Sequence, residues 1–342
     1  MTGKVMPDDI YHGGDLDRAR ARWGEPDGGW LDLSTGINPE PYPVDGAEGA
    51  DFASLPQPVA CEKLMAAAAA YYGVPDPALV VPAPGTQAVI QWLPRLCPPG
   101  PVAINGPTYG GYTEPWRAAG HGVTMALDLA HATENAATVI LANPNNPDGR
   151  RVQPAELGRV AKTLAARGGR LIVDEAFADT EPALSAASLT GTDGLVILRS
   201  FGKFFGLAGL RLGFALAPAD LAMALRGALG PWAVSGPALA IGTKALADRS
   251  WIAATRARLG EGRANLDDML VGAGLKIIGG TDLFRLVEDE AAPDLFQHLG
   301  HAGIFARHFT ERPHWLRFGL PPTAGVPRLE AALKAWRQGV FR

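Results

Sequence analysis

The amino-acid sequence predicts an α/β protein with a large, mostly parallel sheet and a second, smaller α+β domain. Short β-rich runs alternate with helix-forming stretches up to about Pro218, and the pattern changes after that residue. The chain of 342 residues is 47% hydrophobic and 19% charged, which suits a globular protein with a sizeable core. Because strands and helices alternate, we expect helices on both faces of the sheet.

The expected strands of the large sheet are short apolar runs bounded by turn residues, at 79–84, 101–105, 137–144, 170–177, 194–201 and 211–217. The alanine-rich stretch 65–74 has high helix propensity and is expected to pack under the first strand. A further helix is expected at 154–169, between two of the strands.

Beyond Pro218 the sequence predicts a long helical region at about 236–272, followed by four short β-rich runs with two helices between and after them. These runs lie at 275–280, 283–289, 304–309 and 315–320. The first residues are rich in Gly, Pro and Asp, which predicts an extended arm. We therefore expect three parts, namely an arm that contributes to the active site, a large domain and a small domain, at 1–45, 46–235 and 236–342.

Composition narrows the class of partner. The net charge of -4 and the lack of a lysine-rich block argue against nucleic acid and anionic membranes. No apolar run reaches the ~20 residues of a membrane span, and the N-terminal segment lacks the apolar core of a signal peptide, so we expect a cytoplasmic protein. Cys61 and Cys97 lack metal-ligand spacing and are expected to be buried thiols, with no metal site. A small molecule is the expected partner.

Polar residues stand where the expected strands end, which is where a doubly wound sheet binds ligands. Gly85 and the two residues after it open a helix whose N–H groups can bind an anion. "NPNNPDG" follows the third strand, Asp174 and Glu175 stand at the end of the fourth, and "RSFGK" follows the fifth. Each feature alone is ordinary turn or cap chemistry. Together they predict one cleft with an anion cradle, an amide, a carboxylate and a lysine.

The segment "SFGKFFGLAGLRLG", residues 200–213, resembles the lysine signature of the class I/II aminotransferases, the fold-type I enzymes that use pyridoxal phosphate. A serine stands three residues before Lys203, Gly-Leu follows, and Arg211 stands eight residues beyond. The glycine spacing, and the lack of Ser or Thr after the lysine, exclude a nucleotide P-loop. The other motifs occur in the order of that family, so the resemblance covers nearly the whole chain.

The resemblance implies the cofactor contacts. Lys203 would form the Schiff base with the aldehyde of pyridoxal phosphate, which needs an amine of lowered pKa. Asp174 would pair with the pyridine nitrogen and make the ring an electron sink, and Arg211 would neutralise the phosphate. The other implied contacts are Gly85, Thr86, Gln87 and Ser200 at the phosphate, Asn146 at the ring 3-hydroxyl and Tyr109 on the ring face.

Two positions depart from the family pattern. Phe177 stands three residues after Asp174, where the family usually has a tyrosine that donates to the 3-hydroxyl, which leaves that contact to Asn146. Leu55 occupies the apparent place of a tyrosine that reaches the cofactor phosphate from the partner subunit in many relatives. Neither departure removes the electron sink. The family resemblance also implies a homodimer with clefts built between the subunits.

Further segments bear on the substrate. Arg317 matches the family arginine that binds the substrate α-carboxylate, and Arg307 lies where relatives acting on phosphorylated amino acids hold the substrate phosphate. The arm segments "YHGGD" and "LDLSTGINPEP", with "GPWAVSGPAL" at 230–239, resemble the L-threonine O-3-phosphate decarboxylases of cobalamin biosynthesis. This resemblance places His12 beside the substrate phosphate and Asn38 near its carboxylate end. The alternative for Arg307 is a solvated charge on an edge strand, and without the resemblance His12 is a surface residue in a flexible arm.

The expected function is therefore pyridoxal-phosphate-dependent decarboxylation of L-threonine O-3-phosphate to (R)-1-aminopropan-2-ol O-phosphate. The alternative is a histidinol-phosphate aminotransferase, which shares the two arginines and a phosphorylated substrate; the arm segments favour the decarboxylase. A catalytically silent binding protein would have lost Lys203 or Asp174, and both are present.

Overall fold

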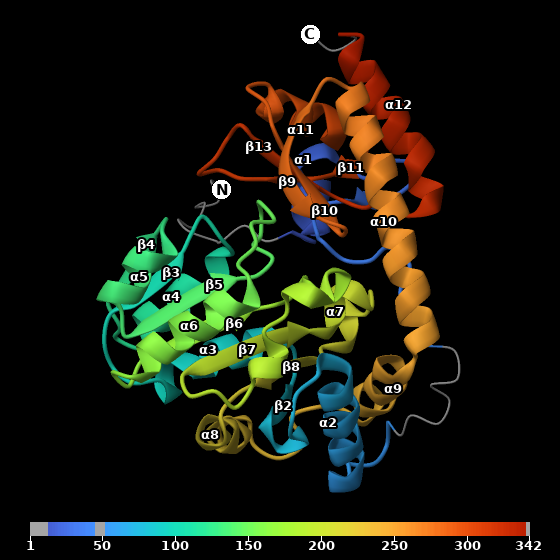
Figure 1. Ribbon diagram of the computed structural model, residues 1–342. Helices are drawn as coiled ribbons and strands as arrows, with labels where there is room; N and C mark the ends of the chain where they lie inside the picture. Colours follow the sequence, from blue (N-terminus) through green and yellow to red (C-terminus); the bar gives the residue numbers. More distant parts are fainter. Residues whose placement is uncertain (1–12, 45–51, 340–342) are drawn as a thin grey trace, which may run out of the picture.

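The computed structural model describes residues 13–44 and 52–339, and it folds into two lobes arranged along one long axis (Figure 1). One lobe is built on a seven-stranded sheet and the other on a four-stranded antiparallel sheet. The long helix α10, Arg249–Gly272, runs along the side of both lobes (Figure 1). The predicted α/β class, with a large and mostly parallel sheet, is confirmed.

The large sheet has the strand order β2-β8-β7-β6-β5-β3-β4. β8 runs antiparallel to both of its neighbours, and the other pairs are parallel. All six expected strands form, because each is a continuous apolar run buried on both faces. The edge strand β4 was not predicted, since its side chains are mostly exposed and carry no such signal. In sheet order the strands are β2 Val80–Ala83, β8 Gly213–Leu216, β7 Leu195–Ser200, β6 Arg170–Asp174, β5 Thr138–Ala142, β3 Val102–Asn105 and β4 Val123–Ala126.

Helices cover both faces of this sheet. Residues of α3, α4 and α8 form one apolar core with alternate residues of the strands, and those of α2, α5, α6 and α9 form the core on the other face. The bounds of the helices of this lobe, which also include the short α7, are α2 Pro58–Tyr72, α3 Thr86–Leu96, α4 Thr113–Ala118, α5 Leu129–Asn135, α6 Pro154–Ala165, α7 Phe201–Phe204, α8 Ala219–Leu229 and α9 Gly236–Ala247. Helix α9 packs on α2 of the large lobe, and the division of the chain at residues 45 and 235 stays a prediction.

The small lobe has the strand order β12-β13-β10-β9; helices α10 and α11 pack against this sheet, and α12 packs against these two helices. The run predicted as one strand at 304–309 forms two short strands: β11, Ile304–Phe305, pairs in parallel with β1, Leu31–Asp32, of the arm, and β12, Arg307–His308, pairs with β13. The arm is thereby joined to the small lobe. The remaining elements are β13 Trp315–Gly319, β10 Phe284–Glu288, β9 Lys276–Thr281, α11 Ala292–His301 and α12 Val326–Arg337.

The expectation of a wholly extended arm is wrong, because Leu16–Trp23 forms helix α1. The Asp15 side chain accepts a hydrogen bond from the Arg18 N–H and caps this helix. Trp23 anchors the helix by packing edge-on against Phe296 of α11, with ring centroids 5.2 Å apart. The turn-rich composition of the arm concealed this short amphipathic helix.

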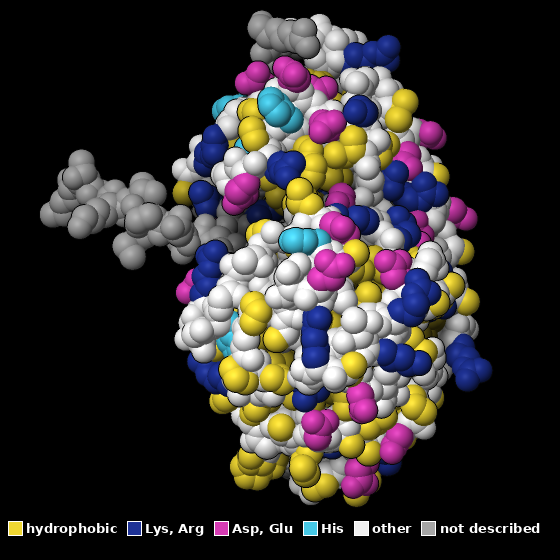
Figure 2. All heavy atoms as spheres, turned by 60° about the vertical axis from the view of Figure 1, so that its left-hand side comes forward, with side chains coloured by type: hydrophobic (Ala, Val, Ile, Leu, Met, Phe, Trp, Pro, Cys, Tyr) yellow, Lys and Arg dark blue, Asp and Glu magenta, His cyan; other side chains and the backbone are white. Residues whose placement is uncertain are grey.

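The surface shows no single-sign patch on the face drawn in Figure 2, where Lys and Arg side chains are interspersed with Asp and Glu. Across residues 13–44 and 52–339, no helix combines the length and the apolar character needed to cross a lipid bilayer.

Candidate active site

The carboxyl ends of the parallel strands and the small lobe enclose a cavity of about 1370 Å³. Most of the residues predicted from sequence line it: Gly85, Thr86, Gln87, Tyr109, Asn146, Asp174, Phe177, Ser200, Lys203, Arg211, Arg307 and Arg317. Residues more than 200 positions apart in the chain are thus brought to one place. His12 lies outside the described residues.

One end of the cavity is an anion cradle. Helix α3 begins at Thr86, and no side chain within residues 13–44 and 52–339 caps its first N–H groups. Gly85 has a left-handed φ of 81°, and a Cβ on this residue would lie 2.6 Å from Nη2 of Arg211, so glycine lets the guanidinium approach the helix start. Ser200, at the end of β7, borders the same space. Free N–H groups, a hydroxyl and a guanidinium together suit a phosphate.

At the other side of the cavity stands the buried carboxylate of Asp174, which ends β6. It accepts hydrogen bonds from the Tyr112 hydroxyl at 2.8 Å and from the Ala176 N–H at 3.0 Å. Burial raises the pKa of Asp174, and the bond from Tyr112 partly offsets this rise. Tyr109, whose hydroxyl donates to Oε1 of Gln87, meets the Tyr112 ring edge-on at 5.2 Å. The sequence analysis missed Tyr112, although it stands three residues after Tyr109.

Removal of the Tyr112 hydroxyl tests this hydrogen bond. In Tyr112→Phe we expect a further rise in the pKa of Asp174, because its charged form loses a donor. A hydrogen bond to a charged group is worth about 1.5–3 kcal/mol, so affinity for pyridoxal phosphate should fall by roughly ten- to a hundredfold. Fluorescence titration of the apoprotein with the cofactor measures this. Tyr71→Phe, which removes a hydroxyl outside the cavity, is the matched control, and equal affinities of the two variants would contradict the role of Tyr112.

Lys203 lies on the four-residue helix α7, directly after β7. Burial, together with the positive charge of Arg317, lowers the pKa of its amine to about 8. Its Nζ lies 5.7 Å from the ring centroid of Phe177, which packs against Phe284. A lysine with a lowered pKa supplies the neutral amine that can attack an aldehyde near neutral pH.

Two arginines of the small lobe face the same cavity. The register of β12 and β13 puts Arg307 directly opposite Arg317, so both side chains leave one face of the sheet. Arg317 is 5% exposed and donates to Oδ1 of Asn146 and to the carbonyl of Ser34. Its Nε has no hydrogen-bond partner among the described residues. Burial and the charge of Arg307 lower the pKa of Arg317 to about 9.

The structure corrects the position of Asn38, which does not line the cavity. Its Nδ2 donates to the Phe204 carbonyl at 2.9 Å, and its Oδ1 accepts from the Glu40 N–H at 3.0 Å. The amide is therefore committed to backbone partners rather than to a ligand. Arg18 of α1 does line the cavity and was missed, because the arm was expected to be extended. Leu55 is 59% exposed near the start of α2.

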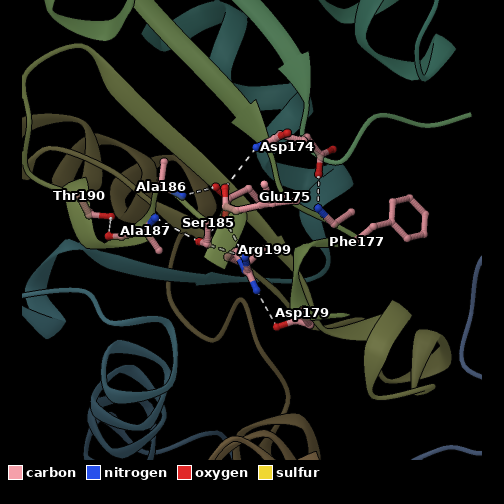
Figure 3. A network of polar contacts seen from close by, with 12 residues as sticks. Asp174, Glu175, Phe177, Asp179, Ser185, Ala186, Ala187, Thr190 and Arg199 are labelled. Atoms are coloured by element: carbon pink, nitrogen blue, oxygen red, sulfur yellow. Dashed lines mark hydrogen bonds and ion pairs between the residues drawn. The ribbon is translucent and has the colours of Figure 1, made fainter. Parts of the chain in front are cut away.

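Beneath the site lies a buried ion-pair network that joins β6 to β7. Successive residues of a strand point to opposite faces, so Glu175 and Arg199 lie beneath Asp174 and Ser200. Arg199 stands between Glu175, at 2.7 Å, and Asp179, at 2.6 Å (Figure 3). All three are at most 2% exposed. Each of the pairs Asp174-Glu175 and Arg199-Ser200 thus gives one side chain to the cavity and one to the network.

Pyridoxal phosphate carries an anionic phosphate, a pyridine nitrogen and an aldehyde, and the cavity offers a partner for each. The cradle at Arg211 suits the phosphate, the buried carboxylate of Asp174 suits a protonated ring nitrogen, and Lys203 suits the aldehyde. The donor set therefore fits the cofactor that the sequence predicted. Fold and site together define a pyridoxal-phosphate-dependent enzyme with a large and a small lobe.

Comparison with known proteins identifies the family. The model for aminotransferase class I and II matches residues 45–335, and the chain belongs to this family. A threonine-phosphate decarboxylase from Sinorhizobium sp is 49% identical over 95% of this chain and 97% of that protein. A second, from Pseudomonas aeruginosa, is 41% identical over 96% and 98%. The crystal structure of histidinol-phosphate aminotransferase from Sinorhizobium meliloti, in complex with pyridoxal-5'-phosphate, superposes with a TM-score of 0.83 at 22% identity, covering 99% of each chain.

Proposed function

We propose that this chain is a pyridoxal-phosphate-dependent threonine-phosphate decarboxylase that forms (R)-1-aminopropan-2-ol O-phosphate and CO₂ in cobalamin biosynthesis. The observation that carries the proposal is the near full-length similarity to two proteins of that name. The paired arginines Arg307 and Arg317 agree with it, because the substrate carries two anionic groups, a phosphate and a carboxylate.

The residues divide the work as follows. Arg211, Ser200 and the N–H groups at the start of α3 hold the cofactor phosphate, and Asp174 keeps the ring nitrogen protonated. When bound, the cofactor supplies an electron sink for the bond that breaks at the substrate Cα. Arg317 binds the α-carboxylate, and orientation of the Cα–carboxylate bond selects loss of CO₂ over loss of a proton. Nζ of Lys203 then delivers a proton to Cα; its pKa of about 8 suits proton transfer near neutral pH.

The direct test is to incubate the cofactor-loaded protein with O-phospho-L-threonine without any keto acid. Stoichiometric release of CO₂ and aminopropanol phosphate over many turnovers supports the proposal. Turnover only with histidinol phosphate and 2-oxoglutarate would overturn it in favour of the aminotransferase alternative, which has the same fold and uses the same cofactor residues.

Arg307 is proposed to bind the substrate phosphate. Arg307→Ala removes one guanidinium from a charge-assisted contact, so kcat/KM for O-phospho-L-threonine should fall by about ten- to a hundredfold. Unphosphorylated L-threonine has no phosphate for Arg307 to bind, so the low turnover of this substrate should be similar in Arg307→Ala and in the parent. Arg312→Ala, at an exposed arginine that does not line the cavity, is the control. An equal loss for both substrates would remove the phosphate role.

We also propose that the protein is a cytoplasmic homodimer. Phe52, Leu55 and Val59, near the start of α2, expose large apolar side chains that a partner subunit would cover. Light scattering on the purified protein tests the dimer, and a monomeric mass would contradict it.

A further inference from the structure

Residues 33–42 of the arm, called the strap here, join the small lobe to the turn that carries Lys203. At the small-lobe end, Leu33 donates its N–H to the Phe305 carbonyl at 2.8 Å and accepts from the Gly319 N–H at 2.7 Å. The next residue, Ser34, accepts at its carbonyl from Nη2 of Arg317 at 2.7 Å. One end of the strap is therefore bonded to the arginine that is proposed to bind carboxylate.

The other end of the strap meets the C-terminus of α7. A helix of four residues, Phe201–Phe204, leaves its last carbonyls without intrahelical donors. The strap supplies donors here. The Asn38 N–H donates to the Lys203 carbonyl at 2.9 Å, which also accepts from the Gly206 N–H at 3.3 Å, and Asn38 Nδ2 donates to the Phe204 carbonyl at 2.9 Å. The Tyr42 N–H donates to the carbonyl of Phe205, the residue after the helix, at 2.8 Å. The strap thus caps the helix that carries the lysine.

Close packing confirms that the strap and this turn fit each other. Gly206, which follows the turn, has a φ of 71°, and a Cβ there would lie 2.6 Å from Cα of Pro41. Asn38 is 2% exposed, and both ends of its amide are hydrogen-bonded. Water cannot readily replace a donor at such a buried site, so loss of the amide leaves the Phe204 carbonyl unsatisfied.

We propose that Asn38 is a positioning residue that fixes the Lys203 turn relative to Arg317, with the strap as the rigid connection between them. Asn38 acts through the backbone on either side of the lysine rather than by touching the substrate. The inference rests on the proposed function for the roles of these two cations. It predicts that a change at Asn38 alters the environment of the lysine even when no substrate is present, because the amine moves relative to Arg317 and Asp174.

The experiment compares Asn38→Ala and Asn38→Asp with a matched control, Asn105→Ala. Asn105 is also a buried asparagine whose Nδ2 donates to a backbone carbonyl, that of Ala126, but it does not line the cavity or touch the strap. Each variant is loaded with pyridoxal phosphate. The measurements are thermal unfolding, the pH titration of the absorbance of the lysine-bound cofactor, and kcat and KM with O-phospho-L-threonine.

For Asn38→Ala we expect the midpoint of the absorbance titration to shift by about one pH unit. We also expect kcat to fall about tenfold, with a smaller change in KM. The control should titrate as the parent does, whatever stability it loses. Asn38→Asp keeps the shape but places a carboxylate oxygen against the Phe204 carbonyl, so it should shift the titration too, and it decides the question if the alanine variant does not fold.

Parent-like titration and kcat in folded Asn38 variants would overturn the inference and leave the strap a purely structural element. The absorbance titration needs no substrate, so it separates this inference from the proposed function. If the Asn38 variants shift the titration but the parent protein releases no CO₂, the positioning role of Asn38 is supported and the decarboxylase function is contradicted. If the Asn38 variants titrate as the parent does and the parent releases CO₂, the decarboxylase function is supported and the positioning role of Asn38 is contradicted.

Discussion

Lys203→Ala is expected to abolish turnover and the absorbance of the lysine-bound cofactor. Among the residues that line the cavity in the described part of the chain, Lys203 is the only lysine, so no other amine can replace it. The variant loses both the covalent attachment and the proton donor, and covalent and acid–base catalysis together predict a loss of about 10⁴-fold or more in kcat. Absorbance spectra and CO₂ release measure the two effects.

Lys162→Ala is the control for this experiment, because Lys162 is an exposed lysine on α6 far from the chemistry. It should keep both the spectrum and the turnover of the parent. If Lys203→Ala kept its turnover, the assignment of the cofactor site would be wrong.

The buried amine of Lys203 should also make the stability of the apoprotein depend on pH. Burial lowers the pKa of Lys203 from 10.5 to about 8, so between these values the unfolded apoprotein binds more protons than the folded one. When the unfolded state binds more protons, the free energy of unfolding rises with pH. The destabilisation caused by burying the charged amine is therefore lost as the pH rises from about 8 to 10.5. The parent apoprotein should therefore gain stability relative to Lys203→Ala between pH 8 and 10.5, which denaturant titrations at several pH values can measure.

Much of the fold could be predicted because its signals are local. The parallel strands are buried on both faces and read as apolar runs, and glycines and prolines mark their ends. Elements that depend on distant partners gave weaker signals. β4 is an exposed edge strand, and the run 304–309 divides because its first residues pair with the arm and Arg307 and His308 pair with β13.

The candidate site shows the same limit. The residues at strand ends converge, because the parallel topology brings those ends to one edge of the sheet. Tyr112 was missed because its bond to Asp174 joins positions 62 residues apart, and nothing in the local sequence reports it. Asn38 was expected near the carboxylate end of the substrate, and the sequence did not reveal that its amide bonds to the Phe204 carbonyl. Backbone contacts of this kind leave no motif of their own.

Arg199→Met is expected to lower the stability of the apoprotein by about 3–5 kcal/mol, because removing one partner of a buried ion pair leaves uncompensated buried charge. Here two carboxylates, Glu175 and Asp179, lose their shared guanidinium, and neither is more than 1% exposed. Urea denaturation followed by circular dichroism measures the change. Arg20→Met is the matched control: Arg20 also binds two carboxylates, but at the surface, where solvent screens the pairs and little change is expected.

The pH dependence of this loss follows from the same network. Burial already raises the pKa of Glu175, and Arg199 is the largest influence that lowers it again. Without the arginine, the folded state should bind a proton that the unfolded state releases, so the stability that Arg199→Met loses relative to the parent should become smaller as the pH falls. Adding Glu175→Gln should relieve part of the loss at neutral pH, since it removes one of the two stranded charges. If Arg199→Met unfolds like Arg20→Met, with no pH-dependent difference, the network does not hold the ends of β6 and β7 together.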